Sequence, residues 1–405
     1  NGHWLPDSVP TWPALIGRNR RTAGIGKMHF NPWDDMGGFQ ERIIAEDKRH
    51  FYLPDDHVKF LRSHGMERFH PTEKPGYFET LQASVTPREK RFHIDGFVGD
   101  QAADWLEANG RDPFAAWVSF PGPHDPYDPP EEMARLYYDA PIPDPVGSPE
   151  ELETKPPAQR KARASRQSSS VYRIDLSRAT PEHYRLWRAH YYANITLIDE
   201  GIGKILAALE AVGALEDTLI VFTSDHGDAL GDHGLAYKSF FYEPIVRVPL
   251  LMRGPGVPAG QRSNALVGTV DLVPLFYRNC GVSPPDTLQG EDVSALLADP
   301  SASIRDAAFS ENLGRAMVRT TRHKYAHYVD GSCELYDLEA DPNELTNLAG
   351  DPDRREIQTT LHARLTEHFL GNVQCHAQLM RRPQNPIRVR LEEEYRKELV
   401  RKGGG

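Results

Sequence analysis

Short apolar runs alternate with amphipathic stretches through residues 1–300, and this alternation constrains the fold more than any other feature. The clearest runs are Phe114–Phe120, Thr218–Thr223 and Val248–Met252, each followed closely by Gly, Pro or Asp. Such runs are typical of buried strands that lead into functional loops. Strands that alternate with helices favour a mostly parallel sheet. We therefore expect an α/β fold with a doubly wound, mostly parallel sheet covered by helices.

The rest of the chain divides into a helix, a second domain and a tail. The clearest helix follows Thr180, the expected N-cap, and should end at Gly213. After an α/β domain at 1–303, residues 304–370 combine short antiparallel strands, polar turns and a helix at 354–370, which predicts a small α+β domain. The charged tail at 371–405 is expected to be solvated or to bridge subunits of a homo-oligomer.

Residues 141–177 differ from the rest of the α/β domain, because a Pro-rich stretch is followed by a basic, Ser-rich one. We expect a solvated, mobile insertion on the surface. The alternative is a lid over an anionic substrate. Its cations would be Arg160, Lys161, Arg163 and Arg166.

Composition excludes several classes of protein. The formal net charge of -11 argues against a dedicated nucleic-acid binder. A mean hydropathy of -0.57 and the lack of an apolar run near about 20 residues argue against a membrane protein. The three cysteines are widely spaced and no signal peptide is visible, which favours a reducing, cytoplasmic location. A periplasmic or secreted location is the alternative if an N-terminal segment is missing.

Asp225 and His226 follow a strand-like run in the segment TLIVFTSDHGDALGDHG. Neighbouring side chains on a strand point to opposite faces, so both can face one ion only where the chain turns, as Gly227 permits. Ligands of open α/β sheets bind beyond the carboxyl ends of strands. The pair is therefore a candidate half of a divalent-metal site. The alternative is a turn-capping Asp beside a surface His.

Lys27 and His29 lie in the segment TAGIGKMHF. If this segment is extended, both side chains project from one face, and Gly24 and Gly26 allow the backbone to approach a neighbour closely. A Lys and a His in one pocket suit an oxyanion. The alternative is an edge strand with two solvated side chains.

Two further candidates are His124 and Lys238. His124 lies in PGPHDPY, where prolines on both sides hold it in a rigid, non-helical loop. A satisfied surface histidine is the alternative, but stiffening of this kind makes sense if the side chain must be aimed. Lys238 comes twelve residues after His226, close enough to return to the same end of the sheet.

These segments together resemble a known family. GIGKMHF, SFPGPHDPY, FTSDHGDALGDHG and YKSFFYEPIVRVPLLMRGPG, in this order, resemble the type I sulfatases of the alkaline phosphatase superfamily. ELYDLEADPNELTNLA resembles the end of that family's small C-terminal domain. The resemblance extends from near residue 3 to about residue 370, without the insertion and the tail.

The resemblance implies a role for each candidate. Asp225 and His226 would be ligands of a divalent metal, Ca²⁺ first, with Mn²⁺ or Mg²⁺ as alternatives. Lys27 and His29 would lie near the nucleophile and the sulfate of a small sulfated or phosphorylated substrate. The remaining pair, His124 and Lys238, would bind sulfate oxygens and help the leaving group depart. A metal and cations would stabilise the negative charge that develops as the ester bond breaks.

The sequence also departs from the family pattern. The family's nucleophile is a formylglycine made in a C-x-P-S-R or S-x-P-S-R segment, and neither occurs in this sequence. An Asp-Asp pair that would complete the metal site, and the first strand of the large sheet, are also expected upstream of Asn1. We therefore expect a sulfatase-type hydrolase that is inactive as a 405-residue chain. The alternatives are a phosphonate or phosphate ester hydrolase of the same superfamily, or a non-catalytic, sulfatase-like anion-binding protein.

Overall fold

The computed structural model describes residues 9–379 except 49, 51, 165–173 and 286–287, together with residues 394 and 397. Its strands are β1 Arg21–Gly26, β2 Glu41–Ile44, β3 Phe114–Ser119, β4 Ile220–Thr223, β5 Leu250–Arg253, β6 Ala308–Asn312, β7 Arg315–Arg319, β8 His323–Tyr328 and β9 Cys333–Asp337. Its helices are α1 Trp12–Ile16, α2 Asp56–Ser63, α3 Ile94–Asn109, α4 Glu131–Ala134, α5 Pro157–Arg163, α6 Pro181–Ala211, α7 Glu243–Val246, α8 Leu272–Asn279, α9 Ser294–Ala298 and α10 Arg355–Leu379.

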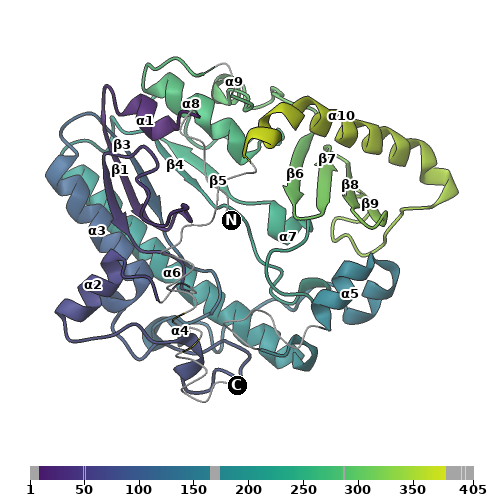
Figure 1. The fold of residues 1–405 in the computed structure, drawn as a ribbon, viewed down its shortest axis with the longest axis horizontal. Coiled ribbons are helices and arrows are strands. Elements are labelled where there is room, and N and C mark those ends of the chain that lie inside the picture. Colours follow the sequence, from purple (N-terminus) through teal and green to yellow (C-terminus); the bar gives the residue numbers. More distant parts are fainter. Residues whose placement is uncertain are drawn as a thin grey trace.

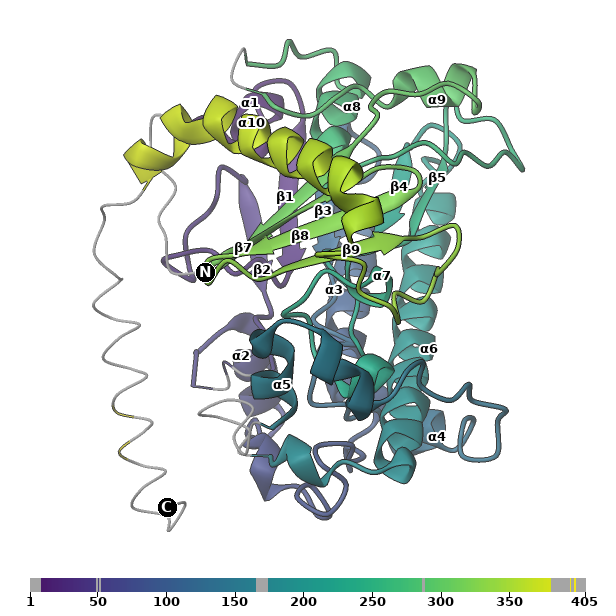
Figure 2. The ribbon, with the colours of Figure 1, turned by 90° about the vertical axis from the view of Figure 1, so that its right-hand side faces the viewer.

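A parallel sheet forms the centre of the α/β part. Its strand order is β2-β1-β3, and the register pairs Ala23 with Glu41 and Arg21 with Phe114. The antiparallel pair β4-β5 lies on the β3 side of this sheet (Figures 1 and 2). The expected α/β fold with a mostly parallel sheet is confirmed.

Helices cover both faces of the sheet. Ala116 and Val118 of β3 pack in the cluster formed with α3 and α6. Because side chains alternate along a strand, Trp117 points to the opposite face, where its ring lies 6.2 Å from that of Trp12 in α1. This arrangement makes the sheet doubly wound. Helices α3 and α6 approach so closely that a Cβ at Gly99 would lie 2.8 Å from the Cα of Gly201.

The three apolar strands are less buried than expected. Trp117 in β3, Phe222 in β4 and Leu251 in β5 are 42%, 41% and 59% exposed. The prediction of buried strands therefore holds only in part for the described residues, since the face that packs on α3 and α6 belongs to the large core.

Helix α6 begins and ends where the sequence predicts. Thr180 is the N-cap, and its side chain and backbone N–H both bond to Nδ1 of His183, at 2.8 and 3.2 Å. Pro181 occupies the first helical position. At the other end Gly213 has a φ of +76°, which only glycine adopts readily.

The insertion at 141–177 is packed rather than solvated where the structure describes it. Leu152, Lys155, Gln159 and Leu176 are all buried. Gln159 donates to the carboxylate of Glu334 in β9 over 2.9 Å, so the insertion is tied to the C-terminal sheet. The expectation of a surface segment is therefore wrong for these buried positions, which pack between two parts of the fold, whereas others, such as residues 143–144 and 147–148, are exposed.

The predicted basic lid is not formed by the two arginines that can be placed. Arg160 donates to the carbonyl oxygens of Leu152, Glu153 and Lys155 at 3.0 to 3.2 Å. Arg163 donates to the carbonyl oxygens of residues 176 and 179. Both guanidinium groups are therefore engaged in holding the insertion together, Lys161 is exposed, and Arg166 lies outside the described residues.

Residues 304–370 form the expected antiparallel sheet and helix. The strand order is β6-β7-β8-β9, and α10 packs across this sheet through Leu361 and Leu365 (Figure 2). Helix α10 continues to Leu379, beyond the end predicted at residue 370. Within the tail, residues 380–393, 395–396 and 398–405 lie outside the described residues. None of the described helices is both long enough and apolar enough to cross a membrane.

Candidate functional site

The loop after β1 carries Lys27 and His29. Strand β1 ends at Gly26, which has a φ of +98° and where a Cβ would lie 2.0 Å from the carbonyl oxygen of Ser119. The predicted close approach at Gly24 and Gly26 is confirmed. Lys27 and His29 follow the strand, and His29 has a left-handed φ of +53°. The segment is therefore extended only as far as Gly26, and a loop, not strand alternation, brings the two side chains together.

His124 lies in the loop after β3, which helix α3 holds in place. The backbone N–H of Gly122 donates to Oδ1 of Asp95 over 2.7 Å. The His124 side chain is 7% exposed. Its Nδ1 lies 2.9 Å from the carbonyl oxygen of Asp125, so Nδ1 is the donor and Nε2 is the nitrogen left to face the site. The structure therefore shows an aimed histidine in place of a solvated surface one.

Asp225 and His226 follow β4 in a turn that lies against α7. The N–H of Gly227 donates to the carbonyl oxygen of Ile245 over 2.7 Å. A Cβ at Gly227 would lie 1.9 Å from the carbonyl oxygen of Pro244. The φ of Gly227 lies outside the left-handed region, so glycine is required here for close approach. The turn brings Oδ2 of Asp225 within 3.4 Å of Nε2 of His226, so that both atoms face one point.

Lys238 joins this turn to the His124 loop. Its Nζ donates to Nε2 of His226 over 2.6 Å and lies 3.3 Å from Nε2 of His124. Burial, opposed by the charge of Asp225 and reinforced by that of Lys238, lowers the pKa of His226 to about 4. The His226 ring is therefore neutral near pH 7, and its Nε2 can accept a hydrogen bond or bind a metal.

Asp47 connects the remaining side chains and was missed from the sequence. Its Oδ2 lies 3.5 Å from Nζ of Lys27, 3.3 Å from Nε2 of His29 and 3.8 Å from Nε2 of His124. Asp47 is fully buried. Contacts of 3.8 Å or less therefore join all six predicted residues, through Asp47, into one cluster beyond the carboxyl ends of the strands.

The signal for this missed part is a run of three ionisable residues directly after β2, namely Glu46, Asp47 and Lys48. Lys48 is also buried, and its Nζ lies 2.7 Å from Oδ1 of Asp128, just beyond the His124 loop. The segment directly after β2 carries no recognisable motif, yet it supplies charged side chains to the site and to the region beside the His124 loop.

The donors present fit half of a divalent-metal site. Asp225 and His226 present one carboxylate and one imidazole to the same point, whereas closed sites commonly need four or more ligands. An ion bound at Nε2 of His226 would take the place of the hydrogen bond from Lys238. Ligand atoms of His29, Glu46 and His50 also lie within 4.8 Å of one another. Both oxygens of that glutamate already accept hydrogen bonds, however.

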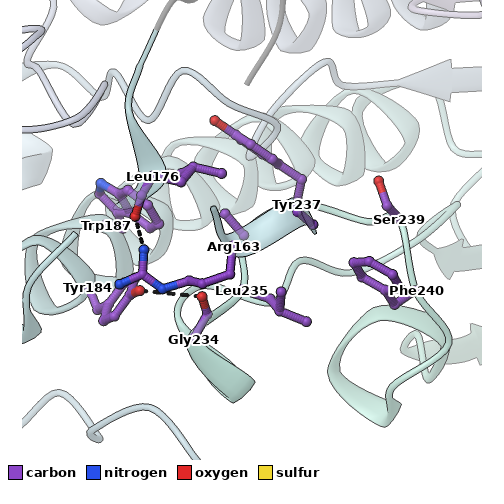
Figure 3. A pocket seen from close by; sticks show the side chains of 11 residues that line it. Arg163, Leu176, Tyr184, Trp187, Gly234, Leu235, Tyr237, Ser239 and Phe240 are labelled. Atoms are coloured by element: carbon purple, nitrogen blue, oxygen red, sulfur yellow. Dashed lines mark hydrogen bonds between the residues drawn. The ribbon is translucent and has the colours of Figure 1, made fainter. Parts of the chain in front are cut away.

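A cavity of about 130 Å³ lies beside the cluster, between the insertion, α6 and the loop after Asp228. Figure 3 shows Tyr237 and Ser239, the neighbours of Lys238, lining it together with Tyr184 and Trp187. Arg163 is the one cation in its described lining, and it donates to a backbone carbonyl oxygen. The cavity is therefore lined mainly by aromatic and aliphatic side chains, and none of the six predicted residues belongs to its described lining.

Comparison with known proteins identifies the family. Residues 8–282 match the family model for sulfatases, and residues 231–370 match that for the C-terminal region of N-sulphoglucosamine sulphohydrolase. The first match covers more than half of the chain. This protein belongs to the sulfatase family. The resemblance stated from its motifs is thus confirmed.

Individual relatives agree with this assignment. The chain is 31% identical over 377 residues to a choline-sulfatase of Rhizobium meliloti (strain 1021), covering 88% of this chain and 70% of that protein. It is 28% identical over 362 residues to an arylsulfatase of Clostridium perfringens (strain 13 / Type A), covering 83% and 72%. A solved phosphonate monoester hydrolase of Agrobacterium radiobacter has a TM-score of 0.74 at 26% identity, covering 90% and 81%. The alkaline phosphatase-like fold is therefore confirmed as well.

Proposed function

We propose that this chain is the sulfate-binding body of a sulfuric ester hydrolase of the arylsulfatase type. Lys27, His124 and Lys238 would bind the oxygens of a small sulfated substrate. The observation that carries the proposal is the convergence of one lysine and two imidazoles on the buried Asp47 carboxylate, with a second lysine and a third imidazole joined to them through His124, in a chain of the sulfatase family.

The chemistry follows from where charge develops. A sulfate ester gains negative charge on its bridging oxygen as the sulfur–oxygen bond breaks, and fixed positive groups stabilise that charge. Lys27 and Lys238 would supply the fixed charges. His124, oriented through its Nδ1, would donate from Nε2 to the leaving oxygen in its doubly protonated form. His29 would lie beside the attacking group.

Asp225 and His226 would hold the divalent ion. Bound there, the ion would supply Lewis-acid stabilisation of a sulfate oxygen. Ca²⁺ is our first expectation, with Mn²⁺ or Mg²⁺ as alternatives, and the imidazole of His226 shifts the preference away from purely oxygen-binding ions. With two donors, the affinity of these residues for any of the ions should be weak.

The formylglycine that the family uses has no matching residue in this sequence, so no step is derived through it. Because covalent catalysis needs an activated nucleophile, we expect little turnover from the 405-residue chain. An assay with a chromogenic aryl sulfate, with Ca²⁺ or Mn²⁺ added, measures this, while isothermal titration with inorganic sulfate should show binding. Robust turnover that Asp225→Ala abolishes would contradict the expected inactivity, and absence of sulfate binding would contradict the proposed function.

A phosphonate or phosphate ester hydrolase is the second candidate, favoured by the likeness to the phosphonate monoester hydrolase. Titration with methylphosphonate beside sulfate separates the two, because the tighter anion indicates the substrate class. Equal, weak binding of both without turnover would favour the third reading, a non-catalytic anion-binding protein.

The remaining expectations about partners stay proposals. The acidic net charge and the enclosure of the cation cluster support a small anionic substrate over nucleic acid. A homo-oligomer formed through the tail, and a cytoplasmic location with a periplasmic or secreted one as the alternative, rest on the sequence alone.

A further inference from the structure

Glu46 contacts both the backbone and the side chain of the segment that carries His29. Its Oε1 accepts hydrogen bonds from the backbone N–H groups of Met28 and His29, at 3.3 and 3.2 Å. Its Oε2 lies 3.2 Å from Nδ1 of the His29 ring. Glu46 is 1% exposed. One buried side chain therefore fixes both the backbone and the ring of His29.

The backbone of His29 shows why such an anchor is needed. A φ of +53° is unusual for a residue with a side chain, so the backbone is strained at this position. The two N–H groups that point to Glu46 belong to this strained turn. A chain without the carboxylate would be free to relax into a commoner conformation and carry the ring away from the cluster.

The charge state of Glu46 favours the same role. Burial tends to raise the pKa of Glu46, but the hydrogen bonds from the His29 side chain and the Met28 backbone oppose it, and the pKa lies below its ordinary value. The group is therefore an ionised acceptor near neutral pH. Nδ1 of His29 is hydrogen-bonded to this carboxylate and is therefore the donor. Nε2 lies 3.3 Å from Oδ2 of Asp47, but among the described residues it makes no hydrogen bond, and it faces the cation cluster.

We propose that Glu46 is a positioning residue, which fixes the rotamer and the Nδ1-protonated form of His29 and so leaves Nε2 as a hydrogen-bond acceptor that faces the cation cluster. This proposal rests on the proposed function for the place of His29 beside the attacking group, but its geometric part does not. A metal ion bound by Glu46 would compete with the hydrogen bonds that its oxygens now accept from two backbone N–H groups and from the His29 ring.

The test is Glu46→Gln in the full chain. The Gln carbonyl can still accept from the two N–H groups, but its NH₂ then faces Nδ1 of His29, which must become an acceptor. The ring proton should therefore move to Nε2. Long-range ¹H–¹⁵N correlation spectra of histidine-labelled protein, assigned with His29→Gln, report this directly.

The matched control is Glu151→Gln. Glu151 also accepts from a histidine Nδ1, that of His233, but in a different part of the fold. This variant should leave the His29 signals unchanged. Glu46→Asp, which keeps the charge, should retain the Nδ1-protonated form.

Two results would overturn the proposal. One is a Glu46→Gln variant whose His29 ring keeps the wild-type protonation pattern. The other needs no variant at all, since a wild-type His29 protonated on Nε2 and not on Nδ1 contradicts the proposed hydrogen bond even if Glu46→Gln fails to fold. A wild-type chain that binds no sulfate would count against the proposed function alone, because the ring signals are measured without the anion.

Discussion

Replacing Lys238 with alanine is expected to lower the affinity for inorganic sulfate by about ten- to a hundredfold, the usual range for a charged hydrogen-bond donor. Lys238 joins the two halves of the cluster, because its Nζ lies 2.6 Å from Nε2 of His226 and 3.3 Å from Nε2 of His124. Without it, Asp47 and Asp225 leave the site more negative, and an anion is repelled. Isothermal titration calorimetry at fixed ionic strength measures the change.

The control for Lys238→Ala is Lys204→Ala. Lys204 is half-exposed and pairs with Asp100 on the outer surface of the helical layer. Its removal changes the net charge by the same amount but should leave sulfate affinity within a factor of about two, because exposed ion pairs contribute little. If both variants lose affinity equally, net charge rather than the cluster attracts sulfate.

Replacing Trp187 with alanine is expected to lower the free energy of unfolding by about 3–5 kcal/mol. Trp187 is fully buried in α6, and its ring centroid lies 5.3 Å from that of Tyr184 and 5.9 Å from that of Tyr127. Its Nε1–H donates to the carbonyl oxygen of Thr80 over 3.2 Å. The variant therefore creates a cavity and also leaves a carbonyl oxygen without its donor.

Urea denaturation followed by circular dichroism measures this loss, and Trp117→Ala is the control. Trp117 has the same side chain but is 42% exposed on β3. Replacing it with alanine therefore leaves no internal cavity of comparable size. We expect a clearly smaller loss of stability. Equal losses in the two variants would contradict the account of the core given above.

Local signals predicted most of the elements. Capping residues located both ends of α6, since Thr180, Pro181 and Gly213 act through neighbours a few residues away. The strands at 114–119 and 220–223 were recognised as apolar runs. The sequence did not predict how deeply those strands are buried, because exposure depends on what packs against each face of the sheet.

The sequence predicted the site residues that lie in recognisable motifs, but it did not predict the carboxylates that connect them. Lys27, His29, His124 and Lys238 stand out beside glycines and prolines, but Glu46 and Asp47 follow an ordinary strand. Their role depends on the parallel pairing of β2 with β1, which places the ends of the two strands together. Sequence spacing does not contain that pairing.

For the insertion at 141–177, the sequence predicted too much exposure to solvent. Its Pro, Ser and Arg content is typical of solvated chain, yet Gln159 and Lys155 reach partners in the C-terminal part of the fold. Polar side chains of this kind can be buried when each finds a partner. Composition alone cannot reveal partners that are more than a hundred residues away.

The central claim is that one cluster of cations and imidazoles binds a tetrahedral oxyanion. A crystal structure of the chain soaked with sulfate tests it most directly. We predict a sulfate whose oxygens lie within hydrogen-bond distance of Nζ of Lys27, Nζ of Lys238 and Nε2 of His124, and which Lys238→Ala crystals lack. Sulfate bound elsewhere while this cluster remains unchanged, or a cluster whose members lie apart in the crystal, would contradict the account.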